Sequence, residues 1–385
     1  MAVTLLSKAL FLFVFSVFSS ICFTGECYTP CYTTKMRSIP ANHLMYKKAK
    51  PLVIGHRGNL RKYQENTLEG FTSLLETNAD GFELDIYLTK DEELVVFHDD
   101  NTMKLTGVSK TMWETTAEEL TKIELPKSLN YDGNVYNYSK RRPIPMLRDV
   151  LNAMKESDKL MYLEIKPSRL RDLRESYNVG RKVAQVVKEM GLVNQASIIS
   201  FDPIKSLAAH LENPNIPTGF FYQPNYWLPS WFDGVYKQVS QVPGMEECIK
   251  RIPNGTAFIK GLFQTGDVPK AINATFLDMN YKIYDNPLYS NNTFQTLRNN
   301  YSPNISAGAY TIYSMKNSKQ EDVGQDAVID SLVKQGAERL ITDDVYRLLA
   351  KLGRPQKHPT ATASKNETFL LNVAFLVMFI VLFIK

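Results

Sequence analysis

The stretch PLVIGHRG, residues 51–58, decides between the two folds that this chain allows. It is a short apolar segment, typical of a buried strand, that ends in Gly-His-Arg-Gly. An open, doubly wound sheet usually places a glycine-rich phosphate turn after its first strand, and that turn is absent here. A closed barrel instead collects reactive side chains at the carboxyl ends of its strands. The stretch therefore favours the barrel.

Strand-like and helix-like segments alternate beyond this point. Their spacing predicts strands at residues 81–88, 94–97, 160–165, 196–201, 218–222, 307–313 and 339–342, and helices at residues 65–78, 145–156, 173–190, 204–211, 322–335 and 345–352. Repeated strand–helix units form a parallel sheet with helical crossovers. We therefore expect an α/β fold, a single (β/α)₈ TIM barrel over residues 51–352, without a dividing linker. The long irregular stretch at roughly 99–143 predicts an insertion after the second strand.

Composition excludes several classes of protein. The 385 residues are 44% hydrophobic and 22% charged, which is typical of a folded globular chain. The net charge of +5 comes from residues spread along the whole chain, so no nucleic-acid partner is expected. The mean hydropathy is −0.24, and long apolar runs lie only near the two ends, which argues against several membrane spans.

The two ends predict the compartment. Residues 1–25 resemble a signal peptide, because Lys8 precedes a short apolar run at residues 9–18; an uncleaved anchor is the alternative. Residues 26–50 form an N-terminal segment. A polar linker at residues 353–368 includes small residues and precedes an apolar tail at residues 369–385. This order is typical of a glycosylphosphatidylinositol (GPI) anchor signal, and a short transmembrane helix is the alternative. We therefore expect an enzyme of the secretory pathway on the extracellular face of the membrane.

The cysteines and glycosylation sequons agree with export but do not prove it. Cys27, Cys31 and Cys248 remain after the signal peptide, so one is unpaired or bridges to another chain, and their pairing stays open. N-x-S/T sequons are frequent, among them those that begin at Asn137, Asn254, Asn273, Asn291, Asn304 and Asn366, as expected of a glycoprotein.

Acidic residues lie on two expected strands. Glu83 and Asp85 are two positions apart, so both side chains point to the same face of their strand. Glu164 and Lys166 repeat this spacing at the end of another apolar strand. Buried acids of like charge are costly without a cation, and oxygen ligands suit hard divalent ions. Glu83, Asp85 and Glu164 thus predict a site for one divalent cation, Mg²⁺ or Ca²⁺ rather than Zn²⁺.

Two histidines also follow expected strands. His56 and His98 can serve as an acid/base pair, because imidazole titrates near neutral pH. Arg57 suits a phosphate oxygen, since its planar guanidinium donates two parallel hydrogen bonds. Lys166 can supply a second charge to the same group.

Taken in order, these motifs resemble those of the glycerophosphodiester phosphodiesterases. The motifs are His56-Arg57-Gly58, Glu65-Asn66-Thr67, Glu83-Leu84-Asp85, His98-Asp99 and Glu164-Ile165-Lys166. The resemblance implies a (β/α)₈ barrel with an insertion. It also implies metal-dependent hydrolysis of small glycerophosphodiesters to an sn-glycerol phosphate and an alcohol. By this resemblance the two histidines are catalytic, the three acids bind the metal, Arg57 and Lys166 bind phosphate, and Glu65 supports the site.

The second half of the chain matches the family less well. Tyr310-Thr311-Ile312-Tyr313 stands where members usually carry a Trp-Thr-Val-Asn-like strand, and Leu340-Ile341-Thr342-Asp343 resembles the closing motif. The alcohol group therefore stays open. An aromatic stretch at residues 220–232 keeps a lysophospholipase D or sphingomyelinase-D-like enzyme as an alternative. A non-catalytic surface binding protein is a second alternative, although no motif acid or histidine is lost.

Overall fold

The computed structural model describes residues 41–167, 173–222, 273–284, 295, 298–299 and 305–354. The expected signal peptide, the apolar tail and the three cysteines named above lie outside these residues, as do residues 223–232 of the aromatic stretch. Within the described part of the chain, no helix is both long and apolar enough to cross a bilayer.

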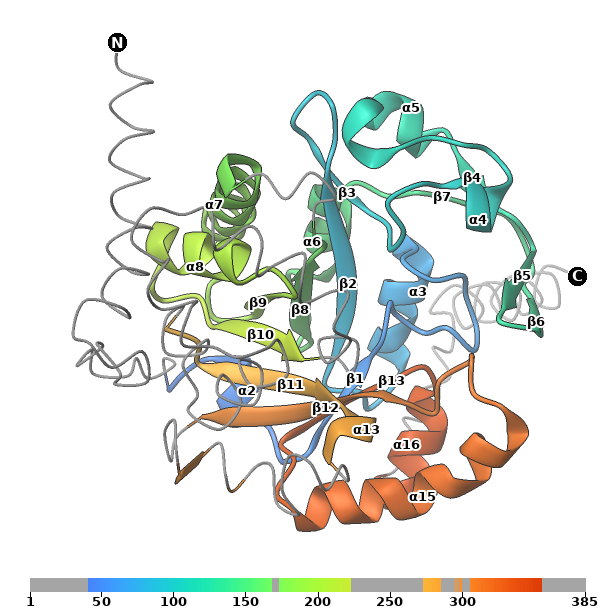
Figure 1. The fold of residues 1–385 in the computed structure, drawn as a ribbon, viewed down its shortest axis with the longest axis vertical. Helices are drawn as coiled ribbons and strands as arrows, with labels where there is room; N and C mark the ends of the chain where they lie inside the picture. The colour runs from blue at the N-terminus through green and yellow to red at the C-terminus, as the bar shows by residue number, and fades with distance from the viewer. Residues whose placement is uncertain are drawn as a thin grey trace, which may run out of the picture.

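Eight parallel strands close into a barrel (Figure 1). Strand β1 closes it by pairing in parallel with both β13 and β2. In barrel order the strands are β1 (Leu52–Gly55), β2 (Gly81–Leu88), β8 (Leu160–Ile165), β9 (Ala196–Ser200), β10 (Thr218–Tyr222), β11 (Phe276–Asn280), β12 (Ser306–Ile312) and β13 (Arg339–Thr342). The predicted (β/α)₈ barrel is therefore confirmed.

Helices follow most strands and cover the outside of the barrel. The described ones are α3 (Leu68–Thr72), α6 (Leu147–Met154), α7 (Leu173–Glu189), α8 (Pro203–Glu212), α13 (Tyr281–Tyr284), α15 (Lys319–Lys334) and α16 (Val345–Lys351), with α2 (Leu44–Lys47) ahead of β1. Their starts follow local chemistry: Asp202 accepts the Ile204 N–H at the start of α8, and Pro203 occupies the first turn. Ser318 and Glu321 form a capping box on α15.

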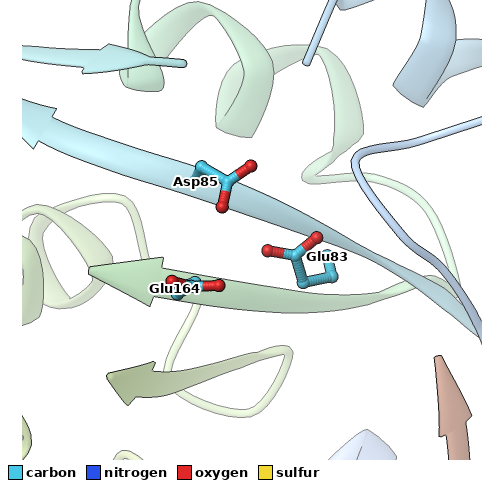
Figure 2. A group of neighbouring side chains, drawn as sticks. All are labelled: Glu83, Asp85 and Glu164. Atoms are coloured by element: carbon cyan, nitrogen blue, oxygen red, sulfur yellow. The ribbon is translucent and has the colours of Figure 1, made fainter. Parts of the chain in front are cut away.

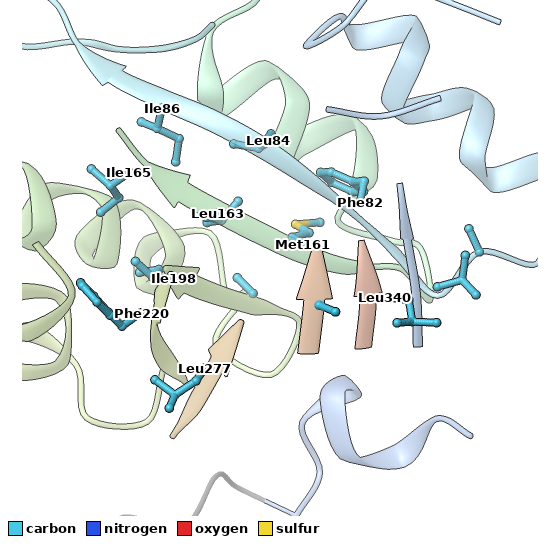
Figure 3. Close-up of a cluster of buried hydrophobic side chains, with 14 of the residues drawn as sticks. Phe82, Leu84, Ile86, Met161, Leu163, Ile165, Ile198, Phe220, Leu277 and Leu340 are labelled. Atoms are coloured by element: carbon cyan, nitrogen blue, oxygen red, sulfur yellow. The ribbon is translucent and has the colours of Figure 1, made fainter. Parts of the chain in front are cut away.

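The strands bury both of their faces, for different purposes. Apolar residues on the outer face pack under the helices, as Figure 3 shows for Leu84, Leu163 and Ile198. The alternating residues point into the barrel, where Ile54, Tyr162 and others form a second apolar cluster. Because side chains alternate along a strand, the polar residues between those outer apolar positions also face the interior. This alternation brings the charged residues of the motifs together.

The predicted insertion after the second barrel strand is also confirmed. It contains β3 (Leu94–Val96), α4 (Met103–Thr106), α5 (Ala117–Thr121), β4 (Glu124–Leu125), β5 (Ser128–Tyr131), β6 (Asn134–Asn137) and β7 (Arg142–Pro143). These elements pack around a small apolar core of their own that includes Phe97, Leu120 and Leu129. Strand β3 pairs antiparallel with β2, so the expected strand at residues 94–97 is a return strand of the insertion and not part of the barrel.

Two further details of the fold differ from the sequence analysis. The sequence did not predict β11, whose apolar run is interrupted by Asp278. The helix expected over residues 65–78 begins only at Leu68, because Asn66 has a left-handed backbone (φ 55°) and Thr67 caps the helix by accepting the Gly70 N–H. The residues just before this helix are therefore available to the barrel mouth.

Candidate active site

The loop after β1 turns sharply at the barrel mouth. Arg57 and Gly58 both have positive φ values, 54° and 96°. A Cβ at Gly55 would lie 2.6 Å from the Gly58 carbonyl oxygen, so only glycine fits that position. The turn directs the Arg57 backbone N–H to Glu83 Oε2, at 2.9 Å. It thereby fixes His56 and Arg57 against β2.

Three carboxylates meet inside the barrel on two neighbouring strands (Figure 2). Glu83 and Asp85 lie on β2, and Glu164 lies on β8 directly opposite Asp85 in the strand register. Each offers an oxygen within 4.8 Å of the others, and all three residues are buried. The expected grouping of these acids is thus present in the structure.

Two cations face the acids. Lys166 Nζ lies 2.7 Å from Glu164 Oε1 and 3.2 Å from Asp85 Oδ1. Arg57 Nη1 donates to Glu65 Oε1 at 2.9 Å, and its Nε lies 3.5 Å from Asp85 Oδ2. Burial alone lowers the pKa of these cations, but the surrounding carboxylates outweigh it and raise the pKa of both. Both side chains therefore stay charged.

The acids outnumber these cations. Among the described residues, the lysine and arginine charges that face the buried carboxylates of Glu65, Glu83, Asp85 and Glu164 are those of Arg57 and Lys166. Four acids and two cations leave a formal charge of −2 when the histidines are neutral. Burial, and then the charges of Asp85 and Glu164, raise the pKa of Glu83. Its Oε1 atom is buried without a hydrogen-bond partner among the described residues. An orphaned carboxylate oxygen within a doubly negative cluster fits a divalent cation.

His56 is held from behind by a carboxylate. Its Nδ1 atom lies 2.5 Å from Asp343 Oδ1, and Asp343 Oδ2 accepts the Met315 N–H at 2.7 Å. The other ring nitrogen, Nε2, lies 3.9 Å from Glu83 Oε2 and 3.3 Å from Arg57 Nε. The Asp343 carboxylate therefore holds Nδ1, and Nε2 faces Glu83 and Arg57.

His98 reaches the same mouth by way of the return strand β3. The Phe97 N–H donates to the carbonyl oxygen of Asp85 at 3.0 Å, which brings the next residue level with the acids. His98 Nδ1 lies 2.6 Å from Asp99 Oδ1. Burial, followed by the charges of Arg57 and Lys166, lowers the pKa of His98 to about 3. Both histidines thus share one arrangement, with Nδ1 on a carboxylate.

The opposite side of the mouth is aromatic. Phe201 follows β9, Phe221 lies on β10 and Tyr310 on β12. The Phe201 and Phe221 rings stack with centroids 4.9 Å apart, and Tyr310 meets Phe221 edge-on at the same distance. Lys166 Nζ lies 5.9 Å from the centre of the Phe201 ring. The charged and aromatic sides therefore adjoin at Lys166.

The structure brings together every residue that the sequence singled out for this site: His56, Arg57, Glu65, Glu83, Asp85, His98, Glu164 and Lys166. Sequence reasoning assigned no role to Asn66, Asp99 and Asp343, which hold these residues in place. All three stand within the quoted motifs, so their positions were visible. Their hydrogen-bond partners were not.

Comparison with known proteins agrees with this geometry. Residues 56–266, more than half of the chain, match the profile of the glycerophosphoryl diester phosphodiesterase family. The chain belongs to this family. It is therefore a phosphodiesterase, and the resemblance noted in its motifs is confirmed.

Individual members of the family are moderately similar to the chain. A glycerophosphodiester phosphodiesterase of Caldanaerobacter subterraneus subsp. tengcongensis is 31% identical over 179 residues, which cover 45% of this chain and 68% of that protein. Lysophospholipase D GDPD1 of Homo sapiens is 32% identical over 100 residues, or 26% of this chain and 32% of that protein.

A solved structure supports the same fold. The phosphodiesterase of Oleispira antarctica, in complex with the product sn-glycerol-3-phosphate, superposes with a TM-score of 0.52. The match covers 79% of this chain and 97% of that one at 16% identity. At that identity the likeness concerns the barrel fold alone.

Proposed function

We propose that this protein hydrolyses glycerophosphodiesters to sn-glycerol 3-phosphate and an alcohol, with a divalent cation and two catalytic histidines. The observation that carries the proposal is the pairing of two carboxylate-held histidines with a buried acidic trio, which belongs to a cluster of four carboxylates and two cations. A phosphodiester is a stable anion, so its hydrolysis needs positive charge together with an acid and a base. This mouth contains residues suited to all three needs.

The cation would be held by Glu83, Asp85 and Glu164. A cation bound there would polarise the phosphoryl oxygens and make the attacking hydroxyl more acidic. Arg57 and Lys166 bind the non-bridging phosphate oxygens, and their charges stabilise the transition state. Glu65 fixes the Arg57 guanidinium by accepting from its Nη1.

The histidines move the protons. One accepts a proton from the attacking hydroxyl, and the other protonates the leaving alcohol. Attack by water gives the glycerol phosphate directly. Attack by the glycerol 2-hydroxyl gives a cyclic phosphate, which water then opens with the two proton transfers reversed. Asp343 and Asp99 bind the Nδ1 atoms of His56 and His98. Nε2 is therefore the atom of each ring that exchanges protons with the substrate.

The first experiment is an assay of the purified protein on glycerophosphocholine, before and after treatment with a chelator. We expect turnover to vanish with the chelator and to return with Mg²⁺ or Ca²⁺. His56→Ala and His98→Ala should each lose at least about 10²-fold in kcat, within the range typical of general acid–base groups. Full activity in the chelated enzyme would exclude the metal assignment. No turnover on any phosphodiester would favour a binding protein instead.

A lysophospholipid is a second candidate substrate, favoured by the aromatic side of the mouth. The Tyr310 hydroxyl donates to the Tyr222 carbonyl at 2.6 Å, so this wall directs its rings rather than that hydroxyl at a substrate. An apolar chain suits such a surface better than a polyol does. Phe201→Ala should then raise KM for lysophosphatidylcholine several-fold and leave KM for glycerophosphocholine nearly unchanged. Equal effects on both substrates would remove this candidate.

We further propose that the protein enters the secretory pathway and is tethered to the outer face of the membrane through the tail at 369–385. Phosphatidylinositol-specific phospholipase C should then release it from intact cells. The sequons offer a second test. Asn137 is exposed on β6, whereas the Asn273 side chain contacts the ring of His210 at 3.2 Å. Asn137→Gln should remove a glycan detectable by glycosidase treatment, and Asn273→Gln should not.

A further inference from the structure

Asn66 lies between the loop after β1 and strand β2. It is 1% exposed and has a left-handed backbone, a conformation that asparagine tolerates better than most residues with a side chain. Its own N–H donates to the carbonyl oxygen of Arg57 at 2.9 Å. The residue is thus tied through its main chain to the loop that carries the phosphate-binding arginine.

Its side chain is tied to a different strand. Asn66 Nδ2 donates to Asp85 Oδ2 at 2.6 Å, and Asn66 Oδ1 accepts the backbone N–H of Asp85 at 3.2 Å. A carboxylate only accepts hydrogen bonds and a backbone N–H only donates, so chemistry fixes the orientation of the amide. The amide nitrogen and the amide oxygen of Asn66 therefore both bond to Asp85.

These bonds divide the two oxygens of Asp85 between different neighbours. Oδ2 is engaged by Asn66, whereas Oδ1 lies 3.2 Å from Nζ of Lys166, which also pairs with Glu164 of the acidic trio. Arg57 Nε, 3.5 Å from Oδ2, is a competing partner. A rotation of the carboxylate toward that guanidinium would turn its oxygens away from the trio. Glu65 also limits the competition of Arg57 for Asp85, because its carboxylate accepts a hydrogen bond from Arg57 Nη1.

We infer that Asn66 is a positioning residue that reserves Asp85 for the divalent cation instead of for Arg57. The inference rests on the proposed function, because it needs a cation at the trio. Partners that orient a metal ligand typically contribute about 10- to 100-fold to metal affinity. We therefore expect a loss of that size in the cation affinity of an Asn66 variant.

The variant that tests this is Asn66→Gly, which removes the amide and keeps the left-handed backbone free of strain. The matched control is Asn59→Ala. Asn59 is also 1% exposed and lies in the same loop, but its amide donates to Ser73 and Tyr346. Both variants lose a buried amide, and only one of them loses contact with Asp85.

The readout is the Kd for Mg²⁺ and for Ca²⁺, measured by calorimetry on the full chain without substrate. We expect Kd to rise about 10-fold or more in Asn66→Gly and to stay at the wild-type value in Asn59→Ala. Activity of Asn66→Gly should recover as the cation concentration is raised, which a purely structural defect would not show. If the glycine variant does not fold, Asn66→Ser carries the test, because its short hydroxyl cannot reach both partners.

The outcomes separate the two claims. A wild-type Kd in Asn66→Gly, or in Asn66→Ser, overturns the role of Asn66 and leaves the metal site standing. If the wild-type protein itself binds neither cation at millimolar concentration, the metal site fails, and the role of Asn66 fails with it.

Discussion

His56 Nδ1 and Asp343 Oδ1 lie 2.5 Å apart although 287 positions separate them in the sequence. The barrel closure explains this contact. β1 and β13 are paired neighbours with Gly55 opposite Thr342, so the residues that follow each strand emerge side by side. The first and last strands thus assemble a histidine–carboxylate pair, of which only the histidine was assigned a role from sequence.

Asp343→Asn should impair catalysis with little effect on folding. An amide at this position can donate to Nδ1 and so favour the wrong tautomer of His56, an effect that costs up to about 10⁴-fold in a comparable triad. We expect kcat on glycerophosphocholine to fall by about 10²-fold or more. The control is Asp344→Asn, because Asp344 pairs with Arg61 and caps α16 without touching His56. Equal kcat values in the two variants would contradict the orienting role.

Glu83→Gln should separate the stability of the protein from its cation binding. Without metal, this change removes one of three crowded negative charges, so the thermal midpoint should rise or stay the same. With metal, the wild type should gain about 2.7 kcal/mol of stability at a cation concentration of 100 Kd, and Glu83→Gln should not. Thermal unfolding with and without Mg²⁺ measures both effects. Glu69→Gln, an acid on the nearby helix α3 that pairs with Lys140, should respond to Mg²⁺ like the wild type. A cation-dependent shift in Glu83→Gln equal to that of the wild type would exclude Glu83 as a ligand.

The barrel could be predicted from the sequence because the alternation of strands and helices is a local pattern. The prediction failed at elements whose residues make contacts far along the chain. Strand β11 carries Asp278 in the middle of an apolar run, which looks like a break in a strand. In the folded chain this carboxylate points into the barrel and pairs with Arg339 on β13 at 2.9 Å. Two opposite charges far apart in the sequence thus satisfy each other inside the core, and no local pattern reveals the pair.

The same difference between local patterns and long-range contacts applies to the candidate active site. Spacing of two residues placed Glu83 with Asp85, and Glu164 with Lys166, because alternation along a strand is a local rule. The carboxylate partner of His56 and the position of His98 were harder to assign. Asp343 follows β13, the last strand of the barrel, and His98 follows the antiparallel strand β3. Both depend on which strands pair, and the sequence alone did not fix that pairing.

The Asp278–Arg339 pair gives a prediction about stability. Both residues are fully buried, and Tyr162 also donates its hydroxyl to Asp278. Asp278→Asn leaves the guanidinium charge buried without its counter-ion, which typically costs about 3–5 kcal/mol. The free energy of unfolding in urea measures the loss. Asp330→Asn breaks an exposed pair with Lys351 and should cost less than about 1 kcal/mol. Similar losses in the two variants would show that the buried pair adds nothing beyond a surface contact.

His43 predicts how stability changes with pH. The ring is buried before α2, where Nε2 donates to the Ala196 carbonyl at 3.0 Å and Nδ1 accepts the Met45 N–H at 3.1 Å. Burial is the main cause that lowers its pKa from 6.5 to about 4. The unfolded chain therefore binds more protons than the folded chain between these values. The stabilisation is complete above about pH 6.5 and is lost as the pH falls through about 4, by about 3 kcal/mol in all.

Comparison of the wild type with His43→Gln isolates this contribution, because other acids titrate equally in both proteins. Urea unfolding at pH 7, 5.5 and 4.5 should show the wild type losing stability faster than the variant, with a difference in slope of up to one proton. Glutamine stays neutral over this range, so it supplies no such slope. Parallel curves for the two proteins would mean that His43 is protonated in the folded state as readily as in the unfolded chain, contrary to its burial and its two hydrogen bonds.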